Sequence, residues 1–212
     1  MDQEYRLSII VPCFGRPART RRIINNILNQ DTNGWEAFII GDGCELFESL
    51  ISSGEKDFYT SLAEKNGNKI HMFNMKEHHG GWGYNCVNYA IENAKGKFFI
   101  FAGNDDKLDT SHFSNYLNSI EKTDLDMVYH KTMIEPFITV RDPILQKARV
   151  GHSELIIRTE ILKGIKQQPI YEADWAIIEE VMKKTNKIKK SESNKITYFV
   201  CRFGDRNSDI ID

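Results

Sequence analysis

The chain begins with a regular alternation of short apolar runs and longer amphipathic stretches. Residues 7–11 (LSIIV), 35–40 (WEAFII), 70–75 and 98–101 (FFIF) are apolar runs of strand length. We expect the first of these strands to end at Pro12, because proline cannot donate to a central ladder. Strand, helix and strand joined by short links predict an α/β fold, with a mostly parallel sheet flanked by helices.

Helices are expected between these strands, because apolar residues recur there at helical spacing. Pro17 is placed to open the first helix, residues 47–65 are expected to form a second, and a third closes at Gly96. The inner faces of the first and third helices are assigned to Ile23, Ile24, Ile27, Leu28, Val87, Ala90, Ile91 and Ala94.

The second half of the chain alternates less regularly. Residues 137–150 predict a loop over the site, with a strand-like ITV inside it. A helix begins at Glu172, and a short one covers residues 159–165. Strands are expected at residues 126–134, 154–157 and 196–203.

Composition places the chain among ordinary globular proteins. It has 212 residues, of which 41% are hydrophobic and 27% charged, a balance unlike that of disordered chains. No apolar run is long enough to span a membrane, and the start MDQEYR is unlike a signal peptide. The four cysteines are far apart and form no CxxC pair, so we expect a reduced, cytoplasmic protein.

Charge is unevenly distributed, although the formal net charge is only −2. Residues 1–140 carry 14 basic and 19 acidic residues, and residues 141–212 carry 14 and 11. Five lysines gather between positions 183 and 190. They form either a solvated surface or a face that attracts a polyanion, such as nucleic acid or an acidic glycan.

Acidic residues follow the most apolar strand directly. Asn104, Asp105 and Asp106 come after residues 98–101 and the small pair Ala102-Gly103. Open α/β sheets bind ligands at the carboxyl ends of their strands. Adjacent carboxylates suit a hard divalent cation, although Asn-Asp-Asp is also good turn chemistry.

Three further polar residues stand at informative places. Asp42 lies between two glycines at the end of the second strand, and Asn88 interrupts an apolar helix face. Asp174 opens a helix beside Trp175. Partial desolvation by the indole would raise the pKa of Asp174 and suit it to act as a general base, while helix capping is the structural alternative.

The order of these motifs resembles that of the GT-A glycosyltransferases, specifically the inverting family 2. VPCFGRP, IIGDG, GYNCVN, FAGNDD, GHSELIIR and YEADW follow one another at the expected spacing over about residues 6–185. The resemblance implies one GT-A domain, Rossmann-like, over residues 1–212. Residues 1–108 would bind the nucleotide sugar, and residues 109–212 would supply the acceptor side and the base.

The resemblance also implies a role for each matching residue. Asp105 and Asp106 would hold Mn²⁺ or Mg²⁺, with Asp106 the more direct contact, and Asp174 would be the catalytic base. The donor, most often a UDP-sugar, would contact Pro12, Phe14, Arg16, Asp42, Asn88 and Asp105. The reaction would be a single displacement with inversion onto a glycan hydroxyl, or onto a hydroxymethylated base as in phage-type DNA.

Some positions depart from the family pattern. Gly15 stands in place of asparagine, and Gly41 and Gly103 stand where acids are common. A histidine that many members carry near the carboxyl end is absent, and Arg202 or Arg206 would replace it. A non-catalytic nucleotide-sugar-binding module therefore remains an alternative. A nucleotidyltransferase ranks lower, because CFGRP contains no glycine-rich, lysine-containing phosphate loop.

Overall fold

The structure is a computed structural model that describes residues 5–201. A seven-stranded sheet with the order β10-β6-β9-β4-β1-β2-β3 forms its centre, and a four-stranded sheet with the order β5-β11-β7-β8 lies beside it. The strands are β1 (Tyr5–Cys13), β2 (Trp35–Gly41), β3 (Lys69–Asn74), β4 (Gly96–Phe101), β5 (Lys107–Leu108), β6 (Met127–Tyr129), β7 (Thr132–Glu135), β8 (Thr139–Arg141), β9 (Leu155–Arg158), β10 (Ile188–Lys190) and β11 (Tyr198–Cys201).

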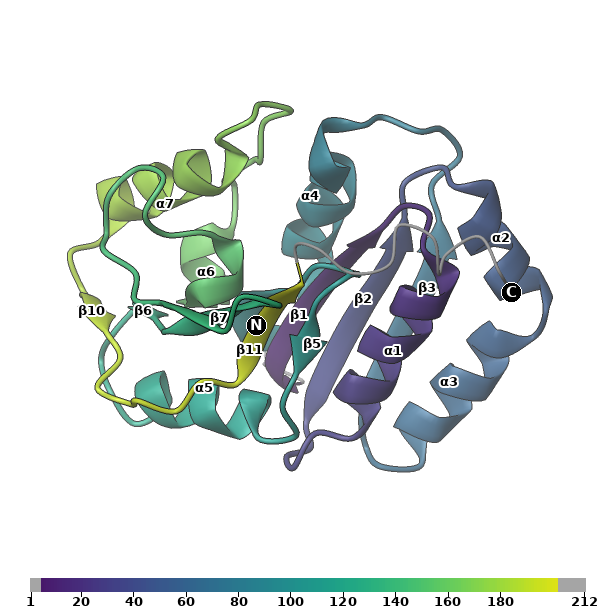
Figure 1. Cartoon of the computed structure of the whole chain (residues 1–212), viewed down its shortest axis with the longest axis horizontal. Coiled ribbons are helices and arrows are strands. Elements are labelled where there is room, and N and C mark those ends of the chain that lie inside the picture. The colour runs from purple at the N-terminus through teal and green to yellow at the C-terminus, as the bar shows by residue number, and fades with distance from the viewer. Residues whose placement is uncertain (1–4, 202–212) are drawn as a thin grey trace.

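Helices cover both faces of the large sheet (Figure 1). One face packs on α1, α2, α3 and α5, and the other on α4, α6 and α7. The helices are α1 (Pro17–Leu28), α2 (Glu45–Ser52), α3 (Glu55–Glu64), α4 (Tyr84–Asn93), α5 (His112–Ile120), α6 (Thr159–Leu162) and α7 (Ala173–Lys184), with 3-10 turns η1 (Gly81–Gly83) and η2 (His152–Glu154).

The parallel core of the sheet confirms the predicted fold class. β1 pairs in parallel with β2 and β4, and β2 with β3. β9 is the exception, because it runs antiparallel between β4 and β6. Phe98 and Phe99 are fully buried, as expected of a strand covered by helices on both sides.

The first strand does not end at Pro12, as we expected from the sequence. β1 continues to Cys13 and pairs with β2 through the last two residues. Proline is tolerated here because β4 has already ended on the other side of β1. The Ile10 carbonyl accepts the last bond on that side, from Ala102 N–H at 2.9 Å, so Pro12, which faces the same way, has no partner to lose.

Two predicted helix boundaries are also wrong. Residues 47–65 form two helices, α2 and α3, because Gly54 adopts a left-handed conformation (φ 88°) between them. Gly96 is the first residue of β4 and does not close the preceding helix. A Cβ at Gly96 would lie 2.4 Å from the Ser8 nitrogen, so this glycine permits close strand packing.

Residues 126–134 were expected to be one strand, but they belong to two sheets. β6 lies in the large sheet and β7 in the small one, and the chain crosses between them at His130. This residue is buried and donates its N–H to the Glu154 carbonyl at 2.8 Å. The last predicted strand is β11, as far as the described residues extend.

The lysine-rich segment at 183–190 is likewise not only a solvated surface, because β10 within it pairs in parallel with β6.

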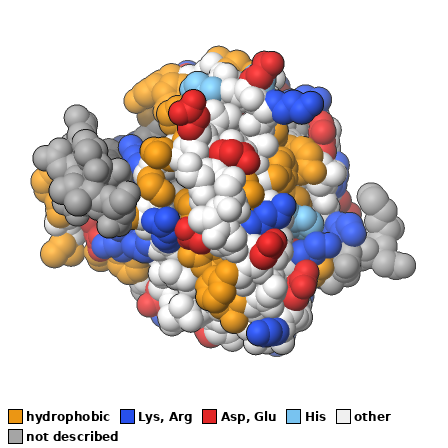
Figure 2. Space-filling view, turned by 90° about the vertical axis from the view of Figure 1, so that its right-hand side faces the viewer, with side chains coloured by type: hydrophobic (Ala, Val, Ile, Leu, Met, Phe, Trp, Pro, Cys, Tyr) orange, Lys and Arg blue, Asp and Glu red, His pale blue; other side chains and the backbone are white. Residues whose placement is uncertain are grey.

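On another face of the molecule, over α1–α3, acidic and basic side chains are interspersed (Figure 2). Arg21 of α1, for example, pairs with Glu55 at 2.9 Å. Within residues 5–201, none of the helices has the length and apolar character needed to cross a membrane.

Candidate active site

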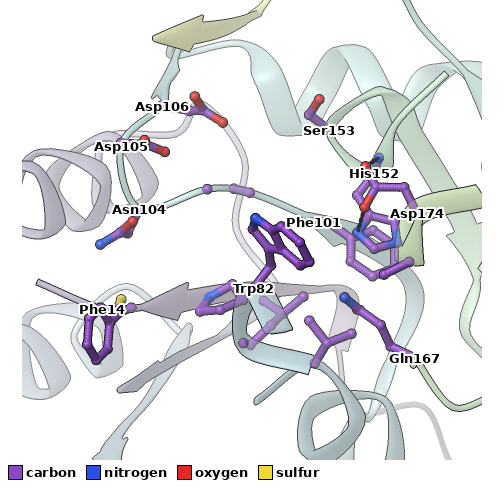
Figure 3. A pocket seen from close by; sticks show the side chains of 18 of the residues that line it. Phe14, Trp82, Phe101, Asn104, Asp105, Asp106, His152, Ser153, Gln167 and Asp174 are labelled. Atoms are coloured by element: carbon purple, nitrogen blue, oxygen red, sulfur yellow. Dashed lines mark hydrogen bonds and ion pairs between the residues drawn. The ribbon is translucent and has the colours of Figure 1, made fainter. Parts of the chain in front are cut away.

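A cavity of about 1070 Å³ opens at the carboxyl ends of β1, β2 and β4 (Figure 3). Its wall is built from both halves of the chain. All of the expected site residues except Asn88 line it, namely Pro12, Phe14, Arg16, Asp42, Asp105, Asp106 and Asp174. The parallel strands bring the first six together, because their carboxyl ends meet at one edge of the sheet.

Asn88 is the exception among the expected donor contacts. Its amide donates to the Gln167 carbonyl at 3.1 Å and accepts from the Gln167 N–H at 2.7 Å. Both ends of the side chain are thus used to hold the loop ahead of α7, and Asn88 does not line the cavity. A partly buried amide of this kind is hydrogen-bonded within the protein, which is the local alternative that its place in the sequence left open.

Asp105 and Asp106 turn into the cavity directly after β4. A Cβ at Gly103 would lie 2.8 Å from Asp106 Oδ2 and 3.0 Å from Asp105 Oδ1. Both carboxylates therefore face a common point that only a glycine leaves open. A side chain at 103 would have to displace the ends of these two carboxylates.

Asp106 is held rigidly and is almost buried. Tyr198 Oη donates to its Oδ2 at 2.5 Å, and Cys201 N–H donates to its Oδ1 at 2.9 Å. Burial raises the pKa of Asp106 to about 6, and the nearby Asp105 charge adds to the rise, against the lowering by these hydrogen bonds. Desolvation disfavours the charged form, so Asp106 would gain from a cation beside it.

Asp105 is more open and is surrounded by arginines. Arg16 Nη1 pairs with its carboxylate, and Arg22 Nη2 donates to its backbone carbonyl at 2.6 Å. Arg16 reaches it because Gly15 and Arg16 both adopt left-handed backbone conformations, with φ of 62° and 54°. The basic first turn of α1 therefore faces the acid pair.

A divalent cation fits this pair of acids. Carboxylate oxygens are the hard ligands that Mg²⁺ and Mn²⁺ prefer, and Mg²⁺ is commonly bound by one or two carboxylates together with substrate phosphates. Among residues 5–201, no group of three or more His, Cys, Asp or Glu side chains is arranged to hold a metal. A diphosphate and water would thus supply the other ligands. Arg202 and Arg206, the suggested replacements for the missing histidine, lie outside the described residues.

Asp42 organises the loop that covers one end of the cavity. Its side chain is buried, and it accepts hydrogen bonds from the N–H groups of His79 at 3.2 Å and Gly80 at 3.1 Å. His78 Nδ1 lies 3.0 Å from Asp42 Oδ2. The loop is thereby tied to the end of β2.

Phe14 and His78 form a stacked pair of rings at the same end, with centroids 4.2 Å apart. Phe14 is 54% exposed, so an aromatic face is available to a planar base. Close by, Gly41 leaves no space for a side chain, because a Cβ there would lie 2.5 Å from the Phe47 ring. The acid that is common at this position in the family cannot be accommodated.

Asp174 stands on the opposite side of the cavity, in the first turn of α7 (Figure 3). Its Oδ1 lies 3.0 Å from His152 Nδ1, and the His152 N–H donates to its Oδ2 at 3.3 Å. The His152 ring is itself stacked on Phe101, with centroids 4.4 Å apart. Half of the Asp174 side chain remains exposed to solvent.

The expected rise in the pKa of Asp174 is wrong. Burial does favour the neutral form, but the ion pair and hydrogen bonds with His152 and the charge of Arg141 outweigh it, and the pKa falls to about 2. Trp175 does not set this balance, since its indole N–H donates to Glu179 at 2.6 Å. Asp174 is consequently ionised and held in one orientation at neutral pH.

Three residues that were not predicted from the sequence also contribute to this site. Tyr198 supports Asp106, His152 supports Asp174, and Trp82 projects over the cavity between them (Figure 3). His152 lies within the motif GHSELIIR, but the motif does not indicate which side chain this histidine contacts. The partner of a histidine depends on which strands the fold brings together.

Comparison with known proteins decides the family. The sequence model described as Glycosyl transferase family 2 matches residues 8–208, nearly the whole chain. The chain belongs to glycosyl transferase family 2. Family membership supports the glycosyltransferase interpretation over a nucleotidyltransferase, in agreement with the missing phosphate loop.

Curated relatives of this family 2 chain are themselves uncharacterised glycosyltransferases. One from Rickettsia bellii is 29% identical over 116 residues, which is 55% of this chain and 15% of that protein. One from Rickettsia typhi is 30% identical over 118 residues, or 56% of this chain and 33% of that protein. The match thus spans a third or less of these relatives.

Solved structures share the fold at low sequence identity. The Staphylococcus aureus TarS fragment 1–349 in complex with UDP-GlcNAc has a TM-score of 0.72 and 16% identity, covering 94% of this chain and 59% of that one. The mannosyltransferase PcManGT of Pyrobaculum calidifontis, in complex with GDP-Man and Mn²⁺, has a TM-score of 0.72 and 15% identity, covering 95% and 58%. Both likenesses support the GT-A fold.

Proposed function

We propose that this chain transfers a sugar, with inversion, from a nucleotide-sugar donor to a hydroxyl group of a glycan. The observation that carries the proposal is the placement of two kinds of carboxylate in one cavity: the acid pair Asp105 and Asp106 on one side, and Asp174 on the other. A displacement at an anomeric carbon needs charge stabilisation at the leaving group and a base at the nucleophile, on opposite faces of the sugar.

On the donor side, the nucleoside would lie along Pro12, Phe14 and Asp42. The Phe14 ring offers a stacking face, and the Asp42 carboxylate would accept bonds from ribose hydroxyls. That role requires Asp42 to exchange the N–H groups of His79 and Gly80 for the ligand. UDP is the first donor nucleotide to test, because the structurally similar TarS fragment was solved with UDP-GlcNAc.

The diphosphate would lie near Asp105, Asp106 and Arg16. A bound Mn²⁺ or Mg²⁺ would act there as a Lewis acid that stabilises charge on the departing phosphate oxygens. Both carboxylates face the space beside Gly103, and Asp106 would be the principal protein ligand because Asp105 is already paired with Arg16. The guanidinium of Arg16 is placed to neutralise a diphosphate oxygen in addition.

On the acceptor side, Asp174 would take the proton from the attacking hydroxyl. A carboxylate with a low pKa is a weak base in the ground state, but it is ionised at any working pH. His152 contacts both carboxylate oxygens of Asp174 and fixes their orientation at the wall of the cavity. Fixed geometry of this kind is a large part of general-base efficiency.

An uncharged carbohydrate acceptor is favoured over modified DNA by the state of the lysine cluster. Lys183, Lys187, Lys189 and Lys190 each pair with an acid, at 2.5, 3.7, 2.5 and 2.6 Å. Lys184 donates to two backbone carbonyls. None of the five lines the cavity. Four of these lysines are thus paired with acids, and the five lie in the last turn of α7, on β10 or in the link between them (Figure 1).

The test is a donor panel with purified protein. UDP-sugars and GDP-mannose are incubated with a mixture of glycans, with Mn²⁺, Mg²⁺ or EDTA, and release of nucleoside diphosphate is followed. We expect metal-dependent release from one donor class, and an inverted anomeric configuration in the product by NMR. Binding of donor without hydrolysis or transfer under any condition would favour the non-catalytic module instead.

The free cysteines found among residues 5–201 support a reducing, cytoplasmic setting.

A further inference from the structure

Two aromatic side chains meet across the mouth of the cavity although they belong to distant loops. The rings of Trp82 and Tyr171 contact edge to face, with centroids 5.8 Å apart and planes at 72°. Trp82 is 66% exposed and Tyr171 is 87% exposed. Large aromatic rings this exposed give up a substantial hydrophobic gain, and both line the cavity that contains the acids.

The backbone holds Trp82 in this place at a cost. Trp82 has a φ of 55°, in the left-handed region that non-glycine residues rarely occupy. Its loop is wedged between two other segments: a Cβ at Gly83 would lie 2.5 Å from Pro12 Cβ, and one at Gly81 would lie 2.9 Å from Pro169 Cβ. Strained residues that the surrounding packing maintains occur preferentially at functional sites.

The rings stand on the acceptor side of the cavity. Tyr171 precedes the proposed base Asp174 by three residues. In Figure 3 the Trp82 indole lies between the acid pair and Asp174. A group that presents a hydroxyl to Asp174 would therefore lie in the same cavity as these two rings.

We propose that Trp82 and Tyr171 form an acceptor subsite that binds the apolar face of a pyranose ring. This inference rests on the proposed glycosyl transfer. A pyranose presents several C–H bonds on one face, and these weakly positive groups are attracted to the electron-rich face of an aromatic ring. Its hydroxyls then remain free at the ring edge to bond to Asp174 and the polar lining.

Local charge selects a neutral sugar over a nucleobase, which also stacks on aromatic rings. The two arginines that line the cavity, Arg16 and Arg141, each pair with an acid. Glu172 lies beside Tyr171 and pairs with Lys147 at 2.5 Å, and Asp174 pairs with His152. A nucleic-acid strand needs cations along its backbone, and this mouth offers carboxylates.

The experiment measures sugar binding apart from catalysis. Saturation-transfer NMR is recorded on the full chain with UDP and Mn²⁺, using methyl glycosides of glucose, galactose, mannose and N-acetylglucosamine as probes. The variants are Trp82→Ala and Tyr171→Ala, and Phe58→Ala is the matched control. Phe58 is 63% exposed and also makes an edge-to-face pair, with Tyr59, but it lies on α3 and does not line the cavity. Trp82→Ala keeps a Cβ at the left-handed position, so backbone strain is comparable, and Tyr171→Ala tests the subsite independently.

We expect at least one pyranoside to bind saturably, with saturation confined to the C–H protons of one ring face. Its Kd should rise about tenfold in each ring variant, the scale of a lost aromatic contact, and stay unchanged in Phe58→Ala. Equal affinity in all proteins, or no saturable binding of any pyranoside to the parent, overturns the inference. So does a short DNA duplex whose binding depends on the two rings.

The same samples distinguish this inference from the proposed function. Donor binding and donor hydrolysis are measured without acceptor in the parent and in Phe58→Ala, and neither should differ between these two proteins. If the parent hydrolyses a donor but the ring variants bind pyranosides normally, the subsite alone is wrong. If the parent neither binds nor hydrolyses any donor, the glycosyl transfer itself is wrong, and the subsite loses its acceptor role.

Discussion

Asp106 and Asp174 lie on opposite sides of one cavity, and their surroundings shift their pKa values in opposite directions. Asp106 is 8% exposed, and burial raises its pKa to about 6 despite the Tyr198 and Cys201 hydrogen bonds. Asp174 is half exposed, and although burial opposes the change, His152 lowers its pKa to about 2. Two identical functional groups are thus poised differently by their neighbours alone.

The difference assigns the two roles. A carboxylate that is costly to ionise in its pocket is stabilised by a cation, which suits a metal ligand. A carboxylate that is ionised and orientated at neutral pH suits proton acceptance. Pairs of titratable groups whose environments separate their pKa values commonly mark such a division of labour.

The largest expected effect is that of Asp106→Asn. Removing the principal metal ligand should lower turnover by about 10³-fold, because a lost metal contact costs several kcal/mol in the transition state. UDP binding should also lose its dependence on Mn²⁺, as measured by calorimetry with and without EDTA. Asp105→Asn should do less, since Asp105 is more open and shared with Arg16. A variant at 106 that binds and turns over like the parent would show that the metal assignment is mistaken.

The second prediction concerns Asp174→Asn. Turnover should fall about 10²-fold or more, the scale of a lost general base, while UDP affinity stays within about twofold. Asparagine caps a helix as well as aspartate, so a pure capping role predicts full activity. Asp57→Asn is the matched control, since Asp57 also lies in the first turn of a helix, α3, away from the cavity. Full activity in Asp174→Asn would show that Asp174 is not the catalytic base.

The third prediction isolates the support of Asp106. Tyr198→Phe removes the hydroxyl that donates to Asp106 and accepts from the Gly103 N–H at 2.9 Å. The buried Asp106 carboxylate and the partly buried Gly103 N–H each lose a partner, so the free energy of unfolding should drop by about 1–3 kcal/mol in urea titrations. The Mn²⁺ affinity of the UDP complex should drop with it. An unchanged free energy of unfolding together with an unchanged Mn²⁺ affinity would mean that the Tyr198 hydroxyl does not support Asp106.

The donor side of this comparison could be anticipated from the sequence, because it depends on local order. Residues 98–101 predict a buried strand, and the acids that follow must lie at its carboxyl end whatever the rest of the fold does. Asp42 at the end of β2 is a similar case. Parallel strand ends meet at one edge, so adjacency follows from topology alone.

The acceptor side could not be anticipated in the same way, because it depends on contacts between distant segments. His152 reaches Asp174 only because β9 runs antiparallel beside β4 and places the preceding turn at the cavity. The sequence offered Trp175 as the neighbour of Asp174, and adjacency along a helix does not bring side chains together. The division of residues 126–134 between two sheets could not be predicted from the sequence either, since both halves are strands.

The last and smallest prediction concerns pH and the packing behind Asp106. Tyr198 contacts the ring of His112, and Tyr116 packs on both His112 and His130, with centroids 4.1 and 3.9 Å away. Burial lowers the pKa of His112 and His130 to about 3 from the ordinary 6.5.

Because these pKa values are lowered in the folded state, the unfolded chain binds protons that the folded chain does not. Stability is therefore complete above about pH 6.5 and declines as the pH falls from there toward 3, by about 1.4 kcal/mol per unit for each histidine. His130→Gln removes one of these groups. Between pH 8 and pH 5.5 the parent should lose about 1.4 kcal/mol more of unfolding free energy than the variant. Urea titrations at the two pH values measure this difference directly. The free energy lost with the ring stack is the same at both pH values, so it drops out of the difference. Parallel pH profiles would show that His130 is protonated in the fold, and that the buried side of the cavity is wetter than its packing indicates.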